Sequence, residues 1–322
     1  MTRFPKLFAT AFILAATCLP AAAQTYPSEP VHLFIGFAAG GSTDIIARDL
    51  GHELEKVWGQ PVVVENRPGA NGAVAAATLA KARPDGHTLM MIVSGHITNA
   101  LMSPNLPFDP IKDFSAVSLV ASSPLLVFAH PAFPASDIKS LIALAKEKPG
   151  TISYATPGAG SIQHLSLELL AYLAGIKLIH VPYRGGSLAL NDVLGGHVPL
   201  SVLSVFQALP YLQNKQIKAL AVTSVKRVDV LPDVPTLSES GVPGYEAALW
   251  FGVIAPAGTP EAVIAKINAD VARIIASPEM RARLAAQGAD PIGSTPAEFL
   301  AFMRAEYEKW GRVIKEAHIA PQ

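Results

Sequence analysis

The chain has 322 residues, half of them apolar, and its 25 basic side chains balance its 25 acidic ones. A chain of this length can bury a large core and is more naturally divided into two domains than folded as one. The balanced charge argues against a basic nucleic-acid surface and against an acidic tail. The aromatic residues are few and are not interleaved with basic ones, which also argues against binding of nucleic acid.

The N-terminus has the pattern of a secretory signal peptide. Two basic residues precede the apolar run Leu7–Leu19, which is too short to span a bilayer comfortably. Ala21–Ala23 forms an A-x-A cleavage signal, so we expect a peptide over residues 1–23, with a retained membrane anchor as the alternative. Cys18, the only cysteine, leaves with that peptide, and the mature chain then has no disulfide and no thiolate ligand for a metal. We therefore predict an exported, periplasmic protein.

The N-terminal part alternates strands and helices. Apolar residues recur at helical spacing from Ile46 to Val57, and Gly59 ends that helix. The order strand, helix, strand, helix, strand is typical of a parallel sheet covered by helices. The other expected elements here are strands over Val31–Phe37, Val62–Glu65 and His87–Ser94 and a helix over Ala73–Ala82.

The rest of the chain continues the alternation and ends in helices. Ser136 is expected to cap a helix that ends at Lys148. Pro260 and Pro278 are expected at the first positions of two C-terminal helices. The further expected elements are strands over Leu178–Pro182, His197–Val205 and Ile217–Thr223, a helix opening at Arg184–Ser187, and a last helix with a capping box at Thr295–Glu298.

Two apolar strands are placed where the chain can pass between domains. Leu119–Ala129 lies before the second strand–loop–helix unit, and Ala248–Ala255 lies after it. These crossings predict an inserted domain. We expect a discontinuous lobe 1 over residues 24–122 and 236–322, and a lobe 2 over residues 123–235.

The loop after the first strand is the strongest candidate for ligand binding. Glycines there allow main-chain N–H groups to approach a ligand closely, and the helix N-terminus that follows favours an anion. A tight turn with a structural cap is the alternative. The chain has no Gly-Lys pair, so this is not a nucleotide P-loop. The candidate residues are Phe37, Ala39, Gly40, Gly41, Ser42, Thr43 and Asp44.

A second loop repeats this layout before another expected helix. Its sequence, TPGAGSIQH, begins like a dinucleotide fingerprint, but Gln163 occupies the place of the third glycine, which weakens that interpretation. Two such loops in one chain suggest a ligand held at both ends. The candidate residues are Thr156, Gly158, Ala159, Gly160, Ser161 and Gln163.

Three more candidates follow the ends of expected strands, where open α/β folds place ligands. Ser94 and His96 follow one strand, although a single histidine is more often structural. Arg184 suits a carboxylate, with a surface ion pair as the alternative. Catalytic and metal signatures are missing, since no G-x-S-x-G or H-E-x-x-H pattern is present, and we expect no cofactor.

Several ordered motifs resemble the Bug-type periplasmic receptors of tripartite tricarboxylate transporters. The resemblance implies an α/β Venus-flytrap fold, in which each lobe is a mainly parallel sheet flanked by helices and the ligand cleft lies between the lobes. It also implies a small di- or aromatic carboxylate as the ligand, held by the two loops, and transporter membrane subunits as partners of a monomeric receptor. His96 and Arg184 depart from the residues that are common in this family. The motifs are FAAGGSTD (37–44), GQPVVVENRPGANG (59–72), ARPDGHTL (82–89), HVPYRGG (180–186), LPDVPTLSESGVPGYEA (231–247) and APAGTP (255–260).

The sequence thus predicts a solute receptor without catalytic activity. Two alternatives from other classes stay open at this point. One is a carboxylate sensor that docks to a signalling partner, and the other is an exported enzyme that acts on small acids.

Overall fold

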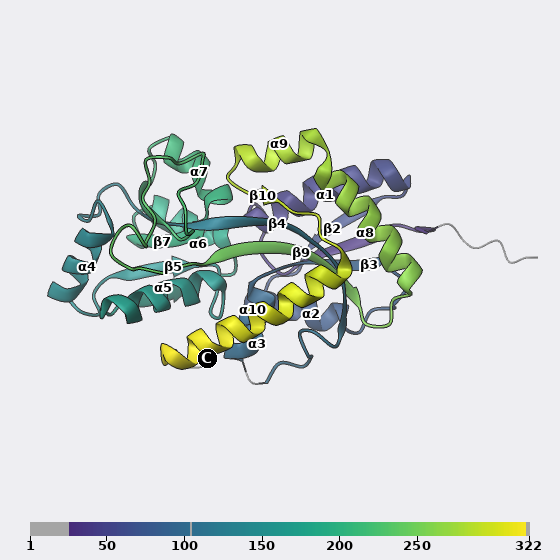
Figure 1. The fold of residues 1–322 in the computed structure, drawn as a ribbon, viewed down its shortest axis with the longest axis horizontal. Helices are drawn as coiled ribbons and strands as arrows, with labels where there is room; N and C mark the ends of the chain where they lie inside the picture. The colour runs from purple at the N-terminus through teal and green to yellow at the C-terminus, as the bar shows by residue number, and fades with distance from the viewer. Residues whose placement is uncertain (1–25, 104, 320–322) are drawn as a thin grey trace, which may run out of the picture.

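Two long strands, β4 (Phe114–Ala129) and β9 (Ala248–Pro256), run antiparallel through the middle of the molecule (Figure 1). The computed structural model describes residues 26–103 and 105–319. The strand order is β2-β1-β3-β9-β4-β7-β5-β6, and β8 and β10 both pair with β4. β4 therefore belongs to the sheets of both halves.

One half contains the parallel strands β1, β2 and β3. Helix α1 follows β1 because Ile46, Leu50 and Leu54 recur on one buried face, and it ends at Gly59, whose φ of 64° places it in the left-handed region. The elements of this half are β1 (Val31–Ile35), α1 (Ser42–Trp58), β2 (Val62–Asn66), η1 (Ala70–Gly72), α2 (Ala73–Leu79), β3 (Thr88–Val93), α3 (Gly95–Met102), α8 (Glu261–Ala276), α9 (Pro278–Ala286), β10 (Asp290–Pro291) and α10 (Pro296–Glu316).

The other half contains the parallel pair β5 and β6 beside β7, which lies antiparallel to β4. Figure 1 shows these strands and helices α4 to α7 on the side away from the N-terminus. The elements of this half are α4 (Ile138–Glu147), β5 (Ser153–Thr156), α5 (Ile162–Ala174), β6 (Ile179–Pro182), α6 (Gly186–Leu194), β7 (Leu200–Ser204), α7 (Val205–Gln213) and β8 (Lys218–Val222).

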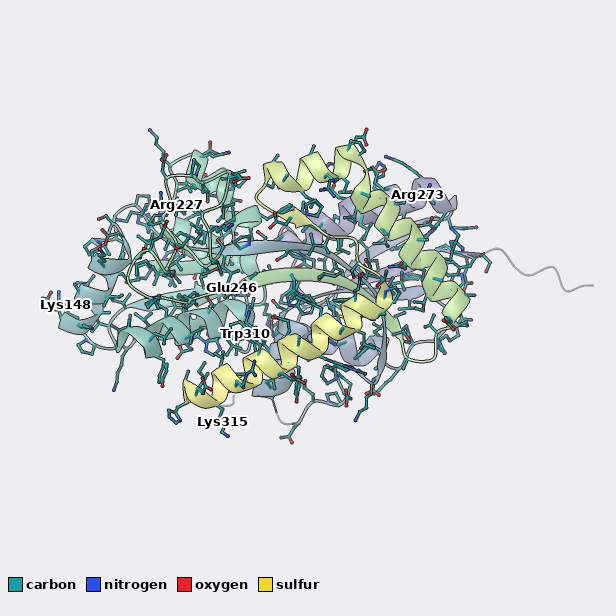
Figure 2. The ribbon with its side chains drawn as sticks, in the orientation of Figure 1. Lys148, Arg227, Glu246, Arg273, Trp310 and Lys315 are labelled. Carbon is teal, nitrogen blue, oxygen red and sulfur yellow. The ribbon has the colours of Figure 1, made fainter. Side chains whose placement is uncertain are left out.

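The last helix, α10, covers one face of the first half. Phe299, Met303 and Trp310 are buried against the core, and Lys315 is exposed near the helix end (Figure 2). The predicted capping box is confirmed, because the Thr295 hydroxyl accepts the Glu298 N–H at 3.3 Å. Among the helices of the described residues, none is long and apolar enough to cross a membrane.

Several predicted element ends were wrong. The cap of α4 is Asp137 rather than Ser136, because the Asp137 carboxylate accepts the Ser140 N–H at 2.7 Å. Pro260 is the N-cap of α8 and not its first residue, whereas Pro278 does begin α9. Helices α3 and α7 were not predicted, since each follows a strand directly with no loop signal between them. The predicted lobe boundaries stay predictions, and the predicted signal peptide lies outside the described residues.

Candidate functional site

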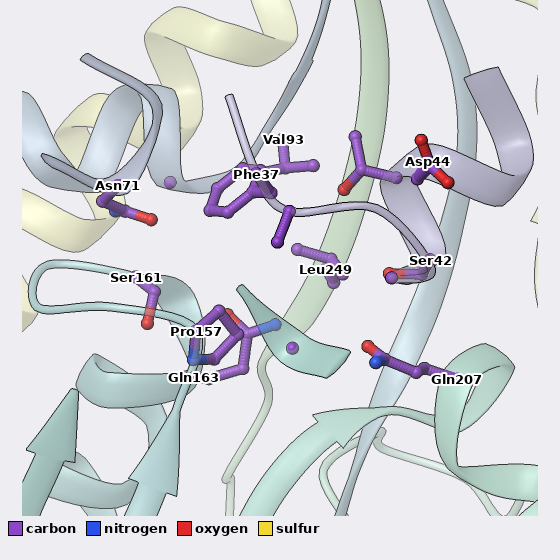
Figure 3. Close-up of a pocket in the computed structure, with 15 residues that line it drawn as sticks. Phe37, Ser42, Asp44, Asn71, Val93, Pro157, Ser161, Gln163, Gln207 and Leu249 are labelled. Atoms are coloured by element: carbon purple, nitrogen blue, oxygen red, sulfur yellow. The ribbon is translucent and has the colours of Figure 1, made fainter. Parts of the chain in front are cut away.

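A small pocket lies between the loop before α1 and the loop before α5 (Figure 3). Among the described residues that line it, none is a lysine, arginine or histidine. The pocket therefore offers backbone groups, hydroxyls and carboxamides in place of cationic side chains. The lining residues are Phe37, Ala38, Gly41, Ser42, Thr43, Asp44, Asn71, Val93, Gly95, Pro157, Ser161, Gln163, Gly186, Gln207 and Leu249.

Helix N-termini converge on this pocket from both halves of the molecule. Helices α1, α3 and α6 begin at the lining residues Ser42, Gly95 and Gly186, and Ser161 is the N-cap of α5. The N-cap of α1 is Gly41, which has no side chain to accept a hydrogen bond from the first turn of the helix. Free N–H groups at helix starts carry partial positive charge and bind anions. These dipoles favour an anion in the pocket.

Asp44 is an acidic residue in the wall of a pocket that favours anions, and its charge is compensated locally. Its carboxylate accepts hydrogen bonds from Arg48 Nε at 3.0 Å, Gly40 N at 3.0 Å and Asn66 Nδ2 at 2.9 Å. Burial acts to raise the pKa of Asp44, but these hydrogen bonds outweigh it and lower the pKa below its ordinary value. Asp44 is thus ionised and paired, and it fixes the loop that precedes α1.

Two histidines support the loop before α5 from behind. The rings of His164 and His180 stack with their centroids 4.0 Å apart. The Gly160 N–H donates to His164 Nδ1 at 3.3 Å, and the Thr156 hydroxyl lies 2.6 Å from His180 Nε2. Burial lowers the pKa of His164 to about 4, and burial together with the neighbouring His164 lowers the pKa of His180 to about 3. Both rings are neutral at neutral pH, so Nδ1 of His164 is able to accept the Gly160 hydrogen bond.

Direct hydrogen bonds join the two sides of the pocket. Ala38 N donates to the Arg184 carbonyl at 3.2 Å, and the Ser187 hydroxyl donates to the Ala39 carbonyl at 2.9 Å. The Thr98 hydroxyl donates to the Gly160 carbonyl at 2.6 Å. These bonds surround the pocket, so the structure has its cleft closed.

The structure brings part of the predicted site to the pocket wall. Ala39 and Gly40 lie in the first loop but do not line the pocket. The Ala39 carbonyl accepts from the Ser187 hydroxyl, and the Gly40 N–H donates to the Asp44 carboxylate. Gly158, Ala159 and Gly160 line a neighbouring groove together with Arg184. The predicted residues that line the pocket itself are Phe37, Gly41, Ser42, Thr43, Asp44, Ser161 and Gln163.

Three predicted residues at strand ends do not line the pocket. Thr156 lies at the end of β5 and contacts His180, as described above. Ser94 is buried at the start of α3, between the lining residues Val93 and Gly95, and its hydroxyl has no hydrogen-bond partner among the described residues. Arg184 is exposed, and its carbonyl accepts the Ala38 hydrogen bond across the cleft.

His96 does not line this pocket, but it lines a neighbouring one that shares Phe37, Asn71 and Val93 with it. Its ring is 7 % exposed and stacks on Phe108 with centroids 5.9 Å apart, while Nε2 lies 2.8 Å from the Pro110 carbonyl. Burial lowers its pKa to about 4. His96 is in the first turn of the unpredicted helix α3, and its ring lies between Phe108 and Phe114 at the edge of the neighbouring pocket. In this structure His96 does not reach the wall of the pocket, and its contacts fit the structural alternative.

Sequence reasoning missed several residues of the pocket wall. Asn71 lies in the turn-rich GANG segment, where an asparagine between glycines was the available signal. Gln207 is in the first turn of α7, a helix that was not predicted. The remaining lining residues that were not predicted are Ala38, Val93, Gly95, Pro157, Gly186 and Leu249.

Comparison with known proteins gives consistent matches over most of the chain. The family model described as "Tripartite tricarboxylate transporter family receptor" matches residues 46–319. The periplasmic binding protein BugD is 34% identical and has a TM-score of 0.89, covering 92% of this chain and 100% of its own. The R. palustris protein Rpa4515, solved with adipate, is 36% identical with a TM-score of 0.90 over the same shares. MatC from Rhodopseudomonas palustris, solved with bound malate, is 34% identical with a TM-score of 0.86, covering 90% of this chain and 100% of its own.

Proposed function

The chain belongs to the tripartite tricarboxylate transporter receptor family, and we propose that it closes around a small carboxylate and delivers this ligand to the membrane subunits of the transporter. The family consists of periplasmic solute-binding receptors with a two-lobe fold, so the chain is a receptor and not an enzyme. We further propose that residues 1–23 are a signal peptide removed on export. N-terminal sequencing of the protein recovered from the periplasm tests this step, and a chain that begins before Gln24 would contradict it.

The convergence of helix N-termini on a pocket without cationic lining is the observation that carries the proposal. The starts of α1 and α5 face each other across the pocket, at Ser42 and Ser161. Such dipoles stabilise a carboxylate at each end of a short ligand. Two similar proteins were solved with the dicarboxylates adipate and malate, which supports this ligand class.

Ligand binding is tested by thermal unfolding of the purified mature protein with a panel of small mono-, di- and aromatic carboxylates. A ligand at a hundred times its dissociation constant stabilises the folded state by about 2.7 kcal/mol, which is a clear rise in Tm. No rise with any carboxylate would contradict the proposal.

A matched pair of variants locates the binding site. Gly41→Asp adds a carboxylate at the start of α1, where Ala38 O, 3.9 Å from an added Cβ, is the nearest atom to meet it. We expect it to abolish the stabilisation by ligand, because like charges repel in the closed cleft. Val57→Asp adds the same charge at the exposed far end of α1 and should leave binding unchanged.

Delivery to the transporter is tested separately in cells. A strain that lacks this receptor should lose uptake of the labelled carboxylate identified above and regain it with the wild-type chain. Restoration by the wild-type chain but not by Gly41→Asp would support delivery. Undiminished uptake in the deleted strain would contradict delivery and favour the sensor alternative.

A further inference from the structure

Two carboxamides in the pocket wall have buried polar atoms without hydrogen-bond partners among the described residues. They are Nδ2 and Oδ1 of Asn71 and Nε2 of Gln207. Figure 3 shows the two side chains projecting into the pocket from opposite sides. A buried donor or acceptor that lacks a partner costs free energy, so native proteins retain such groups where a ligand or water completes them.

The amide of Asn71 is held in place by its backbone and by two glycines. Asn71 has φ 50° and ψ 39°, a left-handed conformation that asparagine tolerates better than most residues. The amide lies against Gly95, where an added Cβ would stand 2.9 Å from Nδ2. Across the cleft, a Cβ at Gly158 would stand 3.7 Å from the Asn71 Cβ. The amide is thus positioned where the two sides of the cleft meet, with neither polar atom paired.

Gln207 is held from the other side in a comparable way. It is 7 % exposed, and its backbone N–H donates to the Ser204 hydroxyl at 3.3 Å, so the side chain lies in the first turn of α7. A Cβ at Gly186 would stand 2.4 Å from its Oε1, which means that only glycine leaves room for this side chain. Nε2 is a buried donor in the pocket while Gln207 keeps this orientation.

These contacts impose a hydrogen-bonding requirement on the ligand. A carboxylate oxygen only accepts, so a plain dicarboxylate pairs with Nδ2 of Asn71 and Nε2 of Gln207 but leaves Oδ1 of Asn71 without a donor. A ligand with a donor beside an acceptor satisfies both atoms of the Asn71 amide. Two chemical groups share this arrangement: a 2-hydroxy acid, with O–H next to the carboxylate, and a primary acid amide, with N–H next to C=O.

On the basis of the proposed function, we propose that Asn71 is a specificity residue that selects carboxylates carrying such an adjacent donor and acceptor, while Gln207 donates to a second acceptor of the same ligand. Sites built to hydrogen-bond a polar group discriminate strongly against analogues that lack it, because their own buried groups are then unpaired. Plain alkanedicarboxylates should therefore be the weaker ligands.

The test is titration calorimetry of the mature protein with malate, succinate and succinamate, three four-carbon acids that differ in one group, and with the carboxylate panel of the thermal unfolding experiment. The wild-type protein should bind malate or succinamate at least about tenfold more tightly than succinate, and the better of the two identifies the group that is recognised. Asn71→Gly keeps the left-handed backbone and removes the amide, so it should bind all three within about twofold. Asn214→Gly removes an exposed carboxamide at the end of α7 and should retain the wild-type preference.

The wild-type measurement decides the inference even if Asn71→Gly fails to fold. Binding of succinate as tight as that of malate and succinamate would overturn it and leave the carboxylate receptor intact. A wild-type preference that survives in folded Asn71→Gly would also overturn it. Binding of no carboxylate at all would overturn the proposed function, and this inference with it, and is distinguishable because every titration is then flat.

Discussion

The Thr98 hydroxyl donates a 2.6 Å hydrogen bond to the Gly160 carbonyl and so joins helix α3 of one half to the loop before α5 of the other. Thr98 is completely buried, and Gly160 has a φ of 71° that presents its carbonyl toward α3. This bond exists only when the two sides of the cleft are together. It therefore favours the closed form, and a ligand that binds this form gains from it.

The first prediction is that Thr98→Val weakens ligand binding about fivefold. The substitution keeps the side-chain shape and removes the buried hydrogen bond to Gly160, which is worth about 1 kcal/mol, together with a long 3.4 Å contact to the Ser94 carbonyl of the same helix. The unfolding temperature of the protein without ligand should change little, since the bond is absent when the cleft opens. Titration calorimetry and thermal unfolding measure the two effects.

The control for this prediction is Thr151→Val. Thr151 is exposed and its hydroxyl donates to the Lys148 carbonyl at 2.8 Å, far from the pocket. It should leave affinity unchanged. An equal loss of affinity in both variants would show that the Thr98 bond has no part in closure.

Much of the fold was predictable because its signals are local. Glycines at strand ends and apolar positions at helical spacing mark β1, α1 and the strands beside them. The long strand β4 was predicted only from Leu119, although it begins at Phe114, since Ser115 and Ser118 interrupt the apolar run at its start. Helix α3 was missed because the chain turns from β3 into it through Ser94 alone.

The sequence predicted the two loops of the candidate site but not the other residues of the pocket wall. Both loops are recognisable in the sequence by the glycines at the start of a helix. Asn71 and Gln207 are single polar residues, and they matter because polar atoms of their side chains are buried without hydrogen-bond partners. That property arises only when distant segments pack together. His96 shows the converse, since its position after a strand suggested a ligand contact and its ring packs on Phe108.

The second prediction concerns pH and His96. Its pKa falls from about 6.5 in the unfolded chain to about 4 in the folded one, because burial disfavours the charged ring. The unfolded state therefore binds the proton first as the pH falls. The contribution of His96 to stability is complete above pH 6.5 and is lost toward pH 4, by up to about 1.4 kcal/mol per pH unit. His164 and His180, whose pKa values are also lowered by burial, act in the same direction.

Urea unfolding between pH 7 and pH 4.5 measures this effect. The wild-type free energy of unfolding should fall over that range, and His96→Gln, which does not titrate, should show a shallower slope. Parallel slopes for the two proteins would contradict the assignment of this proton uptake to His96.

The third prediction is that Asp44→Asn destabilises the protein by about 2 kcal/mol, as expected when charge-assisted hydrogen bonds are weakened in a buried site. Asp44 is 5 % exposed and binds Arg48, Gly40 and Asn66.

The control is Asp49→Asn on the same helix, whose 3.2 Å ion pair with Arg283 is partly exposed and should contribute less than about 1 kcal/mol. Urea unfolding at pH 7 measures both, and equal losses would show that Asp44 has no special role in the loop.

The last prediction is that Gly186→Ala impairs binding without unfolding the protein. The new Cβ would stand 2.4 Å from Gln207 Oε1 and 3.1 Å from its Nε2, so the carboxamide must leave its place in the pocket. The side chain of Gln207 is able to rotate, and alanine favours the helix that begins at Gly186, so the unfolding temperature without ligand should change little. Affinity for the carboxylate should fall about tenfold, because the Nε2 donor no longer lies in the pocket. Gly311→Ala is the control, since its Cβ meets only Leu101 at an ordinary 3.6 Å, and it should bind as the wild type does. Unchanged affinity in Gly186→Ala would show that Gln207 does not contact the ligand.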